Sequence, residues 1–425
     1  MGWSIFVWWV ALGCLSVKVY PLSAFYEECP TASSSTPLYR LKSSILCDYD
    51  SYLRPVKDHR NVTTVSFRLV LKYFEYDHFS HTLSVDAWFT AFWLDHHLTW
   101  NPDDFEGIKT IHLSSSNDIW VPDISVYNRK DQSVEPNVIG HTTCSVTYKG
   151  IVLCVPPVHF DTLCVPNLKK YPYDTQTCTI RFGSWVQKGE DLNIREIKPM
   201  VDTEDLENNG EWELVSFKSI RHKGDNYTCC PNSTFPSIEV SLEIKRNSHT
   251  HSINLVLPLL VCILLTITTM AMNPSNKDRF ILSCVSFISH IIHVQNLSYS
   301  LPITGENMPS ILTISRDSTL LTGISVAVTV LLRNLMQNKN SSPTWMASAT
   351  SVLIGSRPGQ LIFLPDNSLK GAAAAQKQED GDTIISSNIE IPASGASDWH
   401  IFAKFLDVLL FVSYLLVYFI ILIRF

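Results

Sequence analysis

Closely spaced cysteines and aromatic residues are the parts of this sequence best suited to forming a binding site. Cys164 and Cys178 enclose thirteen residues, which include an aromatic–Pro–aromatic–Asp run at 171–174. In an oxidising compartment this spacing predicts a rigid, disulfide-closed loop that turns at the proline. Cys229 and Cys230 are adjacent, so a disulfide between them would join Cα atoms that lie closer than is usual for this bond. Chance adjacency, or pairing with other cysteines, is the alternative for these two.

Four other cysteines form two further candidate pairs. Cys144 and Cys154 lie at equal distances from a predicted hairpin turn at 148–150, so a cross-strand disulfide is feasible if the strand register permits it. Cys29 and Cys47 are the second candidate pair.

Aromatic residues recur near these cysteines and near turn-forming residues. Taken singly, each is more often a core residue than a ligand contact. Grouped together, their ring faces would attract a cation such as a quaternary ammonium, which cannot donate a hydrogen bond. The candidates are Trp88, Tyr127, Trp185, Tyr227 and Phe235.

Composition restricts the class of protein. The chain has 425 residues, which is too long for one ordinary soluble domain, and a net charge of −7 without a basic block, which disfavours nucleic acid as a partner. The sequence contains no phosphate-cradling glycine loop and no supported Ser–His–Asp grouping, so we expect neither an enzyme nor a cofactor. Its histidines lack a compact ligand set, so we expect no metal site.

The amino-terminal half reads as a secreted domain. Residues 1–20 carry a short apolar run that predicts a signal peptide, with a membrane helix as the alternative. Residues 21–252 contain many stretches in which apolar and polar side chains alternate, and these predict an antiparallel β-sandwich, preceded by a short helix at 37–46. Sequons in this segment predict glycosylation at Asn61, Asn226 and Asn232.

Four apolar segments follow the predicted sandwich. They predict a four-helix transmembrane bundle embedded in lipid, with spans at 253–272, 280–301, 310–334 and 403–425. A polar stretch at 336–402 predicts a mostly flexible cytoplasmic loop. The basic linker between the first two spans is then cytoplasmic, which puts both termini outside the cell. The predicted fold is therefore an extracellular β-sandwich joined to a membrane bundle.

Three motifs together carry a family resemblance that covers most of the chain except the cytoplasmic loop. The Cys164–Cys178 segment resembles the signature loop of the pentameric Cys-loop receptors. The sequence Tyr227-Thr-Cys229-Cys230-Pro resembles the clasp of nicotinic acetylcholine-receptor α-type subunits, and the aromatic residues occur in the order of that family's cage. The resemblance implies a disulfide between Cys229 and Cys230. It assigns the principal face of the agonist site to Tyr127, Trp185, Tyr227, Cys229, Cys230 and Phe235, and the complementary face to Trp88.

The resemblance also implies a function. The chain would be one subunit of a pentameric, acetylcholine-gated cation channel in the postsynaptic plasma membrane. Its partners would be acetylcholine or a related amine, other nicotinic-type subunits and membrane lipid. The alternative is a ligand-binding or regulatory subunit that assembles in heteropentamers but conducts poorly itself.

The second span should line the pore of such a channel. Helical spacing puts Ile281, Val285, Ile288, Ile292 and Gln295 on one face. The resemblance makes Ile288 the central apolar gate and Asp278 the cation-selecting group at the inner mouth, with a plain linker charge as the alternative for Asp278. Because this face is strongly apolar, we expect poor conduction without companion subunits.

A further set of residues resembles the family's coupling region, where agonist binding would be passed to the pore. Arg246 resembles the coupling arginine that precedes the first span. Asp77 and His78 fall in the strand connection expected to meet it, and the aromatic–proline pair of the disulfide loop would press on the pore domain. The expected coupling residues are Asp77, His78, Tyr171, Pro172 and Arg246.

Overall fold

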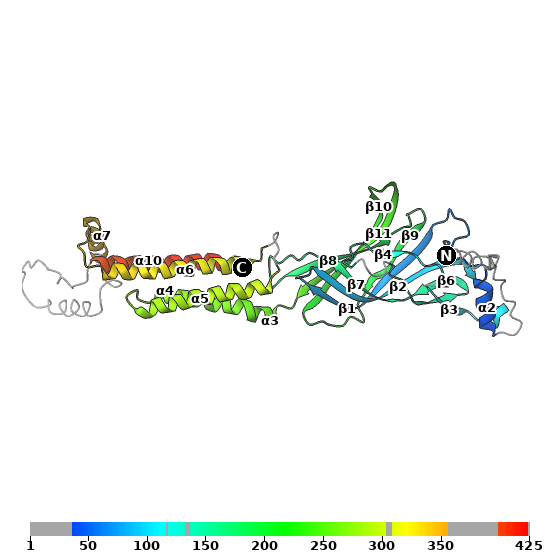
Figure 1. The fold of residues 1–425 in the computed structure, drawn as a ribbon, viewed down its shortest axis with the longest axis horizontal. Coiled ribbons are helices and arrows are strands. Elements are labelled where there is room, and N and C mark those ends of the chain that lie inside the picture. Colours follow the sequence, from blue (N-terminus) through cyan, green and yellow to red (C-terminus); the bar gives the residue numbers. More distant parts are fainter. Residues whose placement is uncertain (1–35, 116–117, 132–136, 303–307, 356–397, 424–425) are drawn as a thin grey trace, which may run out of the picture.

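The computed structural model describes residues 36–115, 118–131, 137–302, 308–355 and 398–423. A β-rich part and a bundle of long helices are joined end to end (Figure 1). The predicted combination of a β-sandwich with a four-helix bundle is thereby confirmed. The predicted signal peptide and Cys29 lie outside the described residues.

Two sheets form the β-rich part. The larger has the strand order β3-β5-β6-β2-β1-β9, with β7 also paired to β2, and the smaller has the order β10-β11-β8-β4. All ladders are antiparallel except that between β1 and β9, which is parallel. The strands are β1 (Thr63–Asp77), β2 (Thr82–Thr99), β3 (Thr110–Ser114), β4 (Ile124–Val126), β5 (Thr143–Thr147), β6 (Lys149–Cys154), β7 (Pro157–Leu163), β8 (Thr175–Ser184), β9 (Leu192–Asp202), β10 (Trp212–Tyr227) and β11 (Cys230–Arg246).

A cluster of phenylalanines packs the two sheets together. In the larger sheet the ring centroids of Phe67 and Phe89 are 4.8 Å apart. Phe182, in the smaller sheet, lies 5.6 Å from Phe67 and 5.9 Å from Phe89. All three are fully buried, because every second residue of a strand faces the opposite sheet. The helix α2 (Pro37–Leu46), which was predicted at the same residues, adds Leu41 to this core.

Four helical stretches are long and apolar enough to cross a membrane, and none differs from its predicted bounds by more than five residues at either end. Helix α5 begins earlier than its apolar run, because the side chain of Asn276 caps it by accepting a hydrogen bond from the Asp278 N–H (3.0 Å). The stretches are His249–Ala271 (α3 at His249–His251, a π-helical turn at Ser252–Val256 and α4 at Leu257–Ala271), α5 (Lys277–Ser300), α6 (Ser310–Gln337) and α10 (Asp398–Ile423).

Helix α7 (Thr344–Gly355) lies inside the stretch predicted to be a mostly flexible loop. It packs on the start of α10, where Trp345 meets Phe402 at 5.7 Å between ring centroids. The hydroxyl of Ser342, just before α7, donates to Asp398 (2.6 Å). These tertiary contacts stabilise a helix that local composition did not indicate. Figure 1 shows α7 at the end of the bundle farthest from the β-rich part.

We expect Phe182→Ala to lower the free energy of unfolding by about 3–5 kcal/mol, because it opens a cavity between the two sheets. Ile220→Ala, at an exposed position of β10, should change it by less than about 0.5 kcal/mol. Thermal unfolding of the purified chain in detergent would compare the two variants. Equal losses of stability would contradict a core centred on Phe182.

Candidate functional site

Four of the aromatic residues predicted to bind ligand lie at one end of the smaller sheet. Tyr127 follows β4, Trp185 follows β8, Tyr227 ends β10 and Phe235 lies in β11. They form two pairs with edge-to-face geometry, Tyr127 with Trp185 at 6.3 Å and Tyr227 with Phe235 at 5.7 Å between ring centroids. Trp185 is 71% exposed and Tyr227 39%, whereas Phe235 is buried. This end of the sheet therefore presents aromatic surface to a ligand or a partner.

Close packing against the backbone of β8 positions Tyr127. Its hydroxyl donates a hydrogen bond to the carbonyl oxygen of Ser184 (2.6 Å). Gly183 leaves room for the ring, since a Cβ at that position would lie 2.2 Å from the tyrosine oxygen. The guanidinium carbon of Arg181 lies 5.8 Å from the ring centroid, within the range of a cation–π contact. Tyr127 therefore has little freedom to move away from Trp185.

Asp123 organises the turn that carries Trp185. Its carboxylate accepts hydrogen bonds from the Ser184 hydroxyl (2.6 Å) and the Val186 N–H (2.7 Å). Sequence reasoning missed this role of Asp123. No local pattern gives this contact, because the turn lies 61 to 63 residues farther along the chain. Farther along the turn, the Gly189 N–H donates to the carbonyl of a β11 residue, Thr234 (2.7 Å), which ties the turn to the strand of Phe235.

The expected disulfide between Cys229 and Cys230 is not formed in the structure. Their sulfur atoms lie 2.8 Å apart and both residues are thiols, whereas a disulfide bond is about 2.05 Å long. The chain also turns here, with Tyr227 paired to Cys230 across the hairpin.

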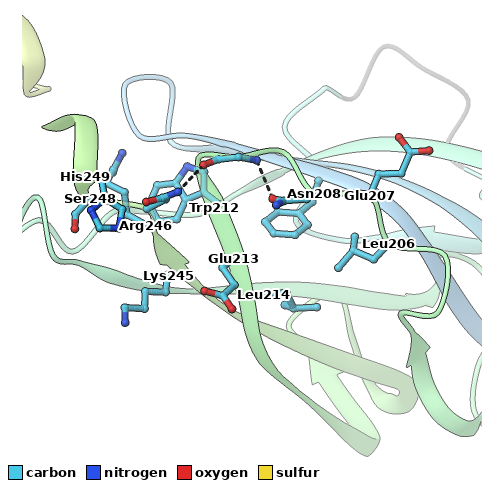
Figure 2. Close-up of a pocket in the computed structure, with 13 residues that line it drawn as sticks. Leu206, Glu207, Asn208, Trp212, Glu213, Leu214, Lys245, Arg246, Ser248 and His249 are labelled. Carbon is cyan, nitrogen blue, oxygen red and sulfur yellow. Dashed lines mark hydrogen bonds between the residues drawn. The ribbon is translucent and has the colours of Figure 1, made fainter.

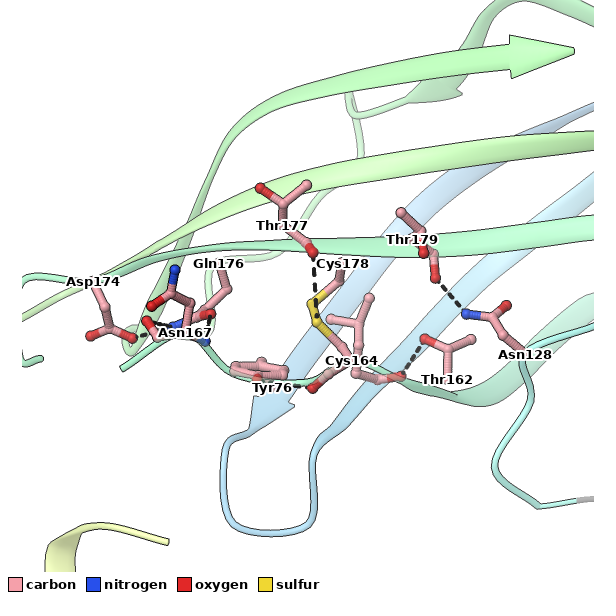
Figure 3. The surroundings of a disulfide bond; sticks show 11 residues. Tyr76, Asn128, Thr162, Cys164, Asn167, Asp174, Gln176, Thr177, Cys178 and Thr179 are labelled. Atoms are coloured by element: carbon pink, nitrogen blue, oxygen red, sulfur yellow. Dashed lines mark hydrogen bonds between the residues drawn. A yellow bond between two sulfur atoms is a disulfide. The ribbon is translucent and has the colours of Figure 1, made fainter. Parts of the chain in front are cut away.

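The other expected disulfides can be placed where their residues are described. Cys164 is bonded to Cys178, with Cα atoms 5.3 Å apart, and Cys144 is bonded to Cys154, with Cα atoms 4.4 Å apart. Cys47 is in a disulfide too. Figure 3 shows the first of these bonds between the ends of β7 and β8.

Trp88 lies apart from the other aromatic residues, on β2 of the larger sheet. Strands β2 and β6 run side by side, with Phe92 opposite Leu153 and Leu94 opposite Ile151. Alternate residues of both strands point outward and are about 40% exposed, forming one apolar row that we call the β2–β6 ridge. It consists of Trp88, Phe92, Leu94, Ile151, Leu153 and Val155. An exposed apolar row of this kind usually marks a contact surface.

Arg246 ends β11 at the junction with the helices. Its guanidinium is buried, with 2% of the residue exposed, and donates to Asp174 (2.9 and 3.3 Å) and to Glu211 (3.0 Å). It also lies 4.2 Å from the ring centroid of Trp212. Both residues line a surface hollow of about 540 Å³, and Figure 2 shows them side by side. Charge pairing, hydrogen bonds and an aromatic face thus compensate for the loss of water around this cation.

Asp77 is the last residue of β1 and His78 begins the connection to β2, but their side chains do not form the ion pairs of Arg246. Asp77 is exposed and accepts a hydrogen bond from the Phe79 N–H (2.8 Å). The Nε2 atom of His78 lies 3.4 Å from the carbonyl oxygen of Ser300 at the end of α5. Burial, together with the Arg246 cation, lowers the pKa of His78, so the ring is neutral at neutral pH. The connection therefore contacts α5, while the carboxylate paired with Arg246 comes from Asp174 of the disulfide loop.

The Cys164–Cys178 loop contacts the beginnings of two helices. The carbonyl of Lys169 accepts hydrogen bonds from the Ser310 N–H (3.0 Å) and hydroxyl (2.9 Å), at the first residue of α6. Tyr171 is buried in the apolar core of the bundle, and its hydroxyl lies 3.1 Å from Nδ1 of His251. Burial raises the pKa of Tyr171 to about 12, so the hydroxyl keeps its proton. Pro172, which follows it, is buried as well.

Helix α5 carries an outward-facing stripe along its length. The six residues expected to line a pore are all exposed in this single chain, while Arg279 and His290 face the other helices. Arg279 forms an ion pair with Asp407 of α10 at 2.8 Å, a contact that the sequence analysis had not anticipated. The stripe, which is open to contacts outside this chain, consists of Asp278, Ile281, Val285, Ile288, Ile292 and Gln295.

Only one predicted glycosylation site can be assessed here. Asn61 is exposed in the segment before β1, as an acceptor site requires. The side chains of Asn226 and Asn232 lie outside the described part of the chain.

Residues 38–248 match the family model of the neurotransmitter-gated ion-channel ligand binding domain. The chain is also 27% identical over 347 residues to the neuronal acetylcholine receptor subunit alpha-6 of Rattus norvegicus, covering 79% of this chain and 68% of the relative. It is 26% identical over 359 residues to the acetylcholine receptor subunit alpha-like 2 of Drosophila melanogaster (81% and 61%). The neuronal acetylcholine receptor subunit alpha-3 of Carassius auratus is 27% identical over 357 residues (81% and 67%).

These similarities identify the class of protein. Residues 38–248 belong to the neurotransmitter-gated ion-channel ligand-binding domains, and the chain is a divergent relative of nicotinic α-type subunits. It is a membrane protein of the ligand-gated channel class and not an enzyme. The chain spans about two thirds of the length of the relatives it matches, between 61% and 68% for these three.

We expect Asp174→Ala to lower the stability of the folded chain by about 3–5 kcal/mol, because it leaves the Arg246 cation buried with part of its charge unpaired. Glu211→Gln, whose side chain is half exposed, should cost less than about 1 kcal/mol. Thermal unfolding of both variants in detergent measures the difference. A cost for Glu211→Gln as large as that for Asp174→Ala would contradict the dominant role of Asp174.

Proposed function

We propose that this chain is one subunit of a pentameric, acetylcholine-gated, cation-selective channel and supplies the principal face of an agonist site. The observation that carries the proposal is the grouping of Tyr127, Trp185, Tyr227 and Phe235 at one end of the smaller sheet. Ring faces attract cations, including those without a hydrogen-bond donor. Acetylcholine or a related amine would bind against Trp185 and Tyr227, the two exposed members of the group.

The β2–β6 ridge supports an assembly of several subunits. Each chain would carry aromatic surface on its smaller sheet and the ridge on its larger sheet, so the two surfaces of neighbouring chains can meet head to tail. Contacts of this heterologous kind close into rings when the rotation between subunits permits. In the ring, Trp88 would complete the agonist site of the adjacent nicotinic-type subunit from the complementary side.

A continuous path from the aromatic group to the helices supports gating. Strand β11 carries Phe235 near one end and Arg246 at the other. Arg246 is paired to the Cys164–Cys178 loop through Asp174, and that loop contacts α6 through Lys169. If agonist binds the open state more tightly than the closed one, it shifts the population toward the open state. Closure of the hairpin of Tyr227 and Phe235 over Trp185 would drive this shift.

The exposed stripe of α5 would line the pore. A ring of Asp278 residues would concentrate cations at the inner mouth, and rings of Ile288 would close the pore by excluding water. In Figure 1 helix α10 ends at the end of the bundle next to the β-rich part. With that part outside the cell, both termini would be extracellular, in a plasma membrane that we expect to be postsynaptic.

A second candidate is a ligand-binding or regulatory subunit that joins heteropentamers but conducts poorly itself. The observation that favours it is the stripe of Ile281, Val285, Ile288 and Ile292, which offers water few polar contacts. The two candidates share the agonist site and differ only in whether α5 of this chain supports ion conduction.

Expression in oocytes, alone and with nicotinic partner subunits, tests the function. We expect acetylcholine-evoked currents only in the mixtures, reversing near zero potential, and with a higher half-maximal acetylcholine concentration in Trp185→Ala because the main ring surface is removed. A robust current from the chain alone would refute our interpretation of the pore stripe. Surface expression and cholinergic ligand binding without current in any mixture would favour the regulatory subunit.

Gly183→Ala tests how the site is built. The added methyl group would displace Tyr127 from its hydrogen bond, which should raise the half-maximal acetylcholine concentration by about two- to tenfold, the equivalent of one hydrogen bond. Ile220→Ala, at an exposed position of β10, is the control and should leave it unchanged. The measurement is the concentration dependence of the current in the mixtures. An unaltered response of the Gly183 variant would show that Tyr127 does not shape the site.

A further inference from the structure

The disulfide Cys144–Cys154 has no role in the arrangement described so far. It joins β5 to the last residue of β6, and the two cysteines face each other directly in the strand register. Both are fully buried. Gly150, with φ of +81°, turns the hairpin at its other end. The hairpin is therefore closed at both ends, by its turn and by the disulfide.

The position of Cys154 matters because of what lies on either side of it. In the ladder between β2 and β6, Cys154 is opposite Ala91 and Leu153 is opposite Phe92. Successive side chains of a strand point to opposite faces, so Cys154 is anchored inside while Leu153 and Val155 point outward. A covalent bond at Cys154 thus fixes the position and register of Leu153 and Val155, two residues of the β2–β6 ridge.

The same point is where β2 changes its partner from β6 to β7. Beyond Cys154 the register continues into β7, where Trp88 is opposite Pro157. The Pro156 carbonyl accepts a hydrogen bond from the Phe89 N–H (2.9 Å), but neither proline can donate one in return. The ladder beside Trp88 therefore contains fewer hydrogen bonds than a regular one. The disulfide at Cys154 is the covalent constraint nearest to Trp88 in this part of the sheet.

We propose that the Cys144–Cys154 disulfide positions the β2–β6 ridge for contact with the neighbouring subunit and thereby sets agonist sensitivity at the site that contains Trp88. This inference rests on the proposed function, in which the ridge is the complementary face. A surface held in its bound geometry before contact loses less conformational entropy on binding. The disulfide lies on the larger sheet, so it acts on the site shared with one neighbour and not on the site formed by Trp185.

The test separates the two sites of one chain. Trp185→Ala leaves only the complementary face intact, and Trp88→Ala leaves only the principal face. Cys144→Ala/Cys154→Ala is added to each, and acetylcholine concentration–response curves are recorded with nicotinic partner subunits in oocytes. We expect the half-maximal concentration to rise about two- to tenfold in the Trp185→Ala background, as for loss of preorganisation of one or two side chains, and to stay unchanged in the Trp88→Ala background.

Equal shifts in the two backgrounds, or no shift in the first, would overturn the proposal. If wild-type mixtures gave neither acetylcholine current nor acetylcholine binding, the proposed function would fail and this inference with it. Failure of the inference alone is therefore distinguishable, because wild-type responses would then be intact.

A second variant covers the case in which the chain without the disulfide does not reach the cell surface. Leu153→Ser alters the ridge but keeps both cysteines, and it should raise the half-maximal concentration only in the Trp185→Ala background. Ile220→Ser, also at an exposed position but on β10 of the smaller sheet, is the matched control. A Leu153→Ser response identical to that of the control would also overturn the proposal.

Discussion

The buried cation of Arg246 is the constraint on which the rest of this structure depends. A guanidinium that is withdrawn from water must have its charge and its hydrogen bonds satisfied by protein groups. Asp174 supplies a carboxylate from the disulfide loop, Glu211 supplies one from the segment before β10, and Trp212 supplies a ring face. Three segments that are distant in the sequence must therefore meet at the point where the last strand leaves the β-sandwich. Their meeting places the loop against the helices, so one electrostatic requirement joins the two parts of the molecule.

Contacts of different kinds join the helices to the β-rich part. Tyr171 enters the apolar core of the bundle, Lys169 bonds to the first residue of α6, and His78 reaches the end of α5. A neutral His78 suits this position, because a second positive charge beside Arg246 would be repelled. In the proposed channel, any displacement of β11 would be transmitted through these contacts together, since the arginine, the loop and the strand connection share one packed junction.

The two sheets carry different kinds of exposed surface. The smaller sheet ends in aromatic pairs whose rings are held by Gly183, Asp123 and backbone carbonyls, while the larger sheet carries the exposed β2–β6 ridge. Apolar surface of this extent is unfavourable in water unless something covers it. A ring of subunits would cover the ridge of each chain with the aromatic end of the next, which is why the stiffness of the ridge matters to the aromatic site.

The sequence by itself determined the elements that rest on periodicity and local chemistry. Alternation predicted the strands, apolar length predicted the four spans, and the Cys164–Cys178 disulfide followed from its spacing around a turn. The Cys144–Cys154 disulfide was only feasible from its spacing, because the strand register decides it. Helical spacing also singled out the exposed stripe of α5. Only the tertiary structure decided which distant groups meet: Asp174 rather than Asp77 or His78 beside Arg246, Asp407 beside Arg279, and α7 against α10. Long-range pairing and turn geometry depend on how whole elements pack, and no local pattern encodes them.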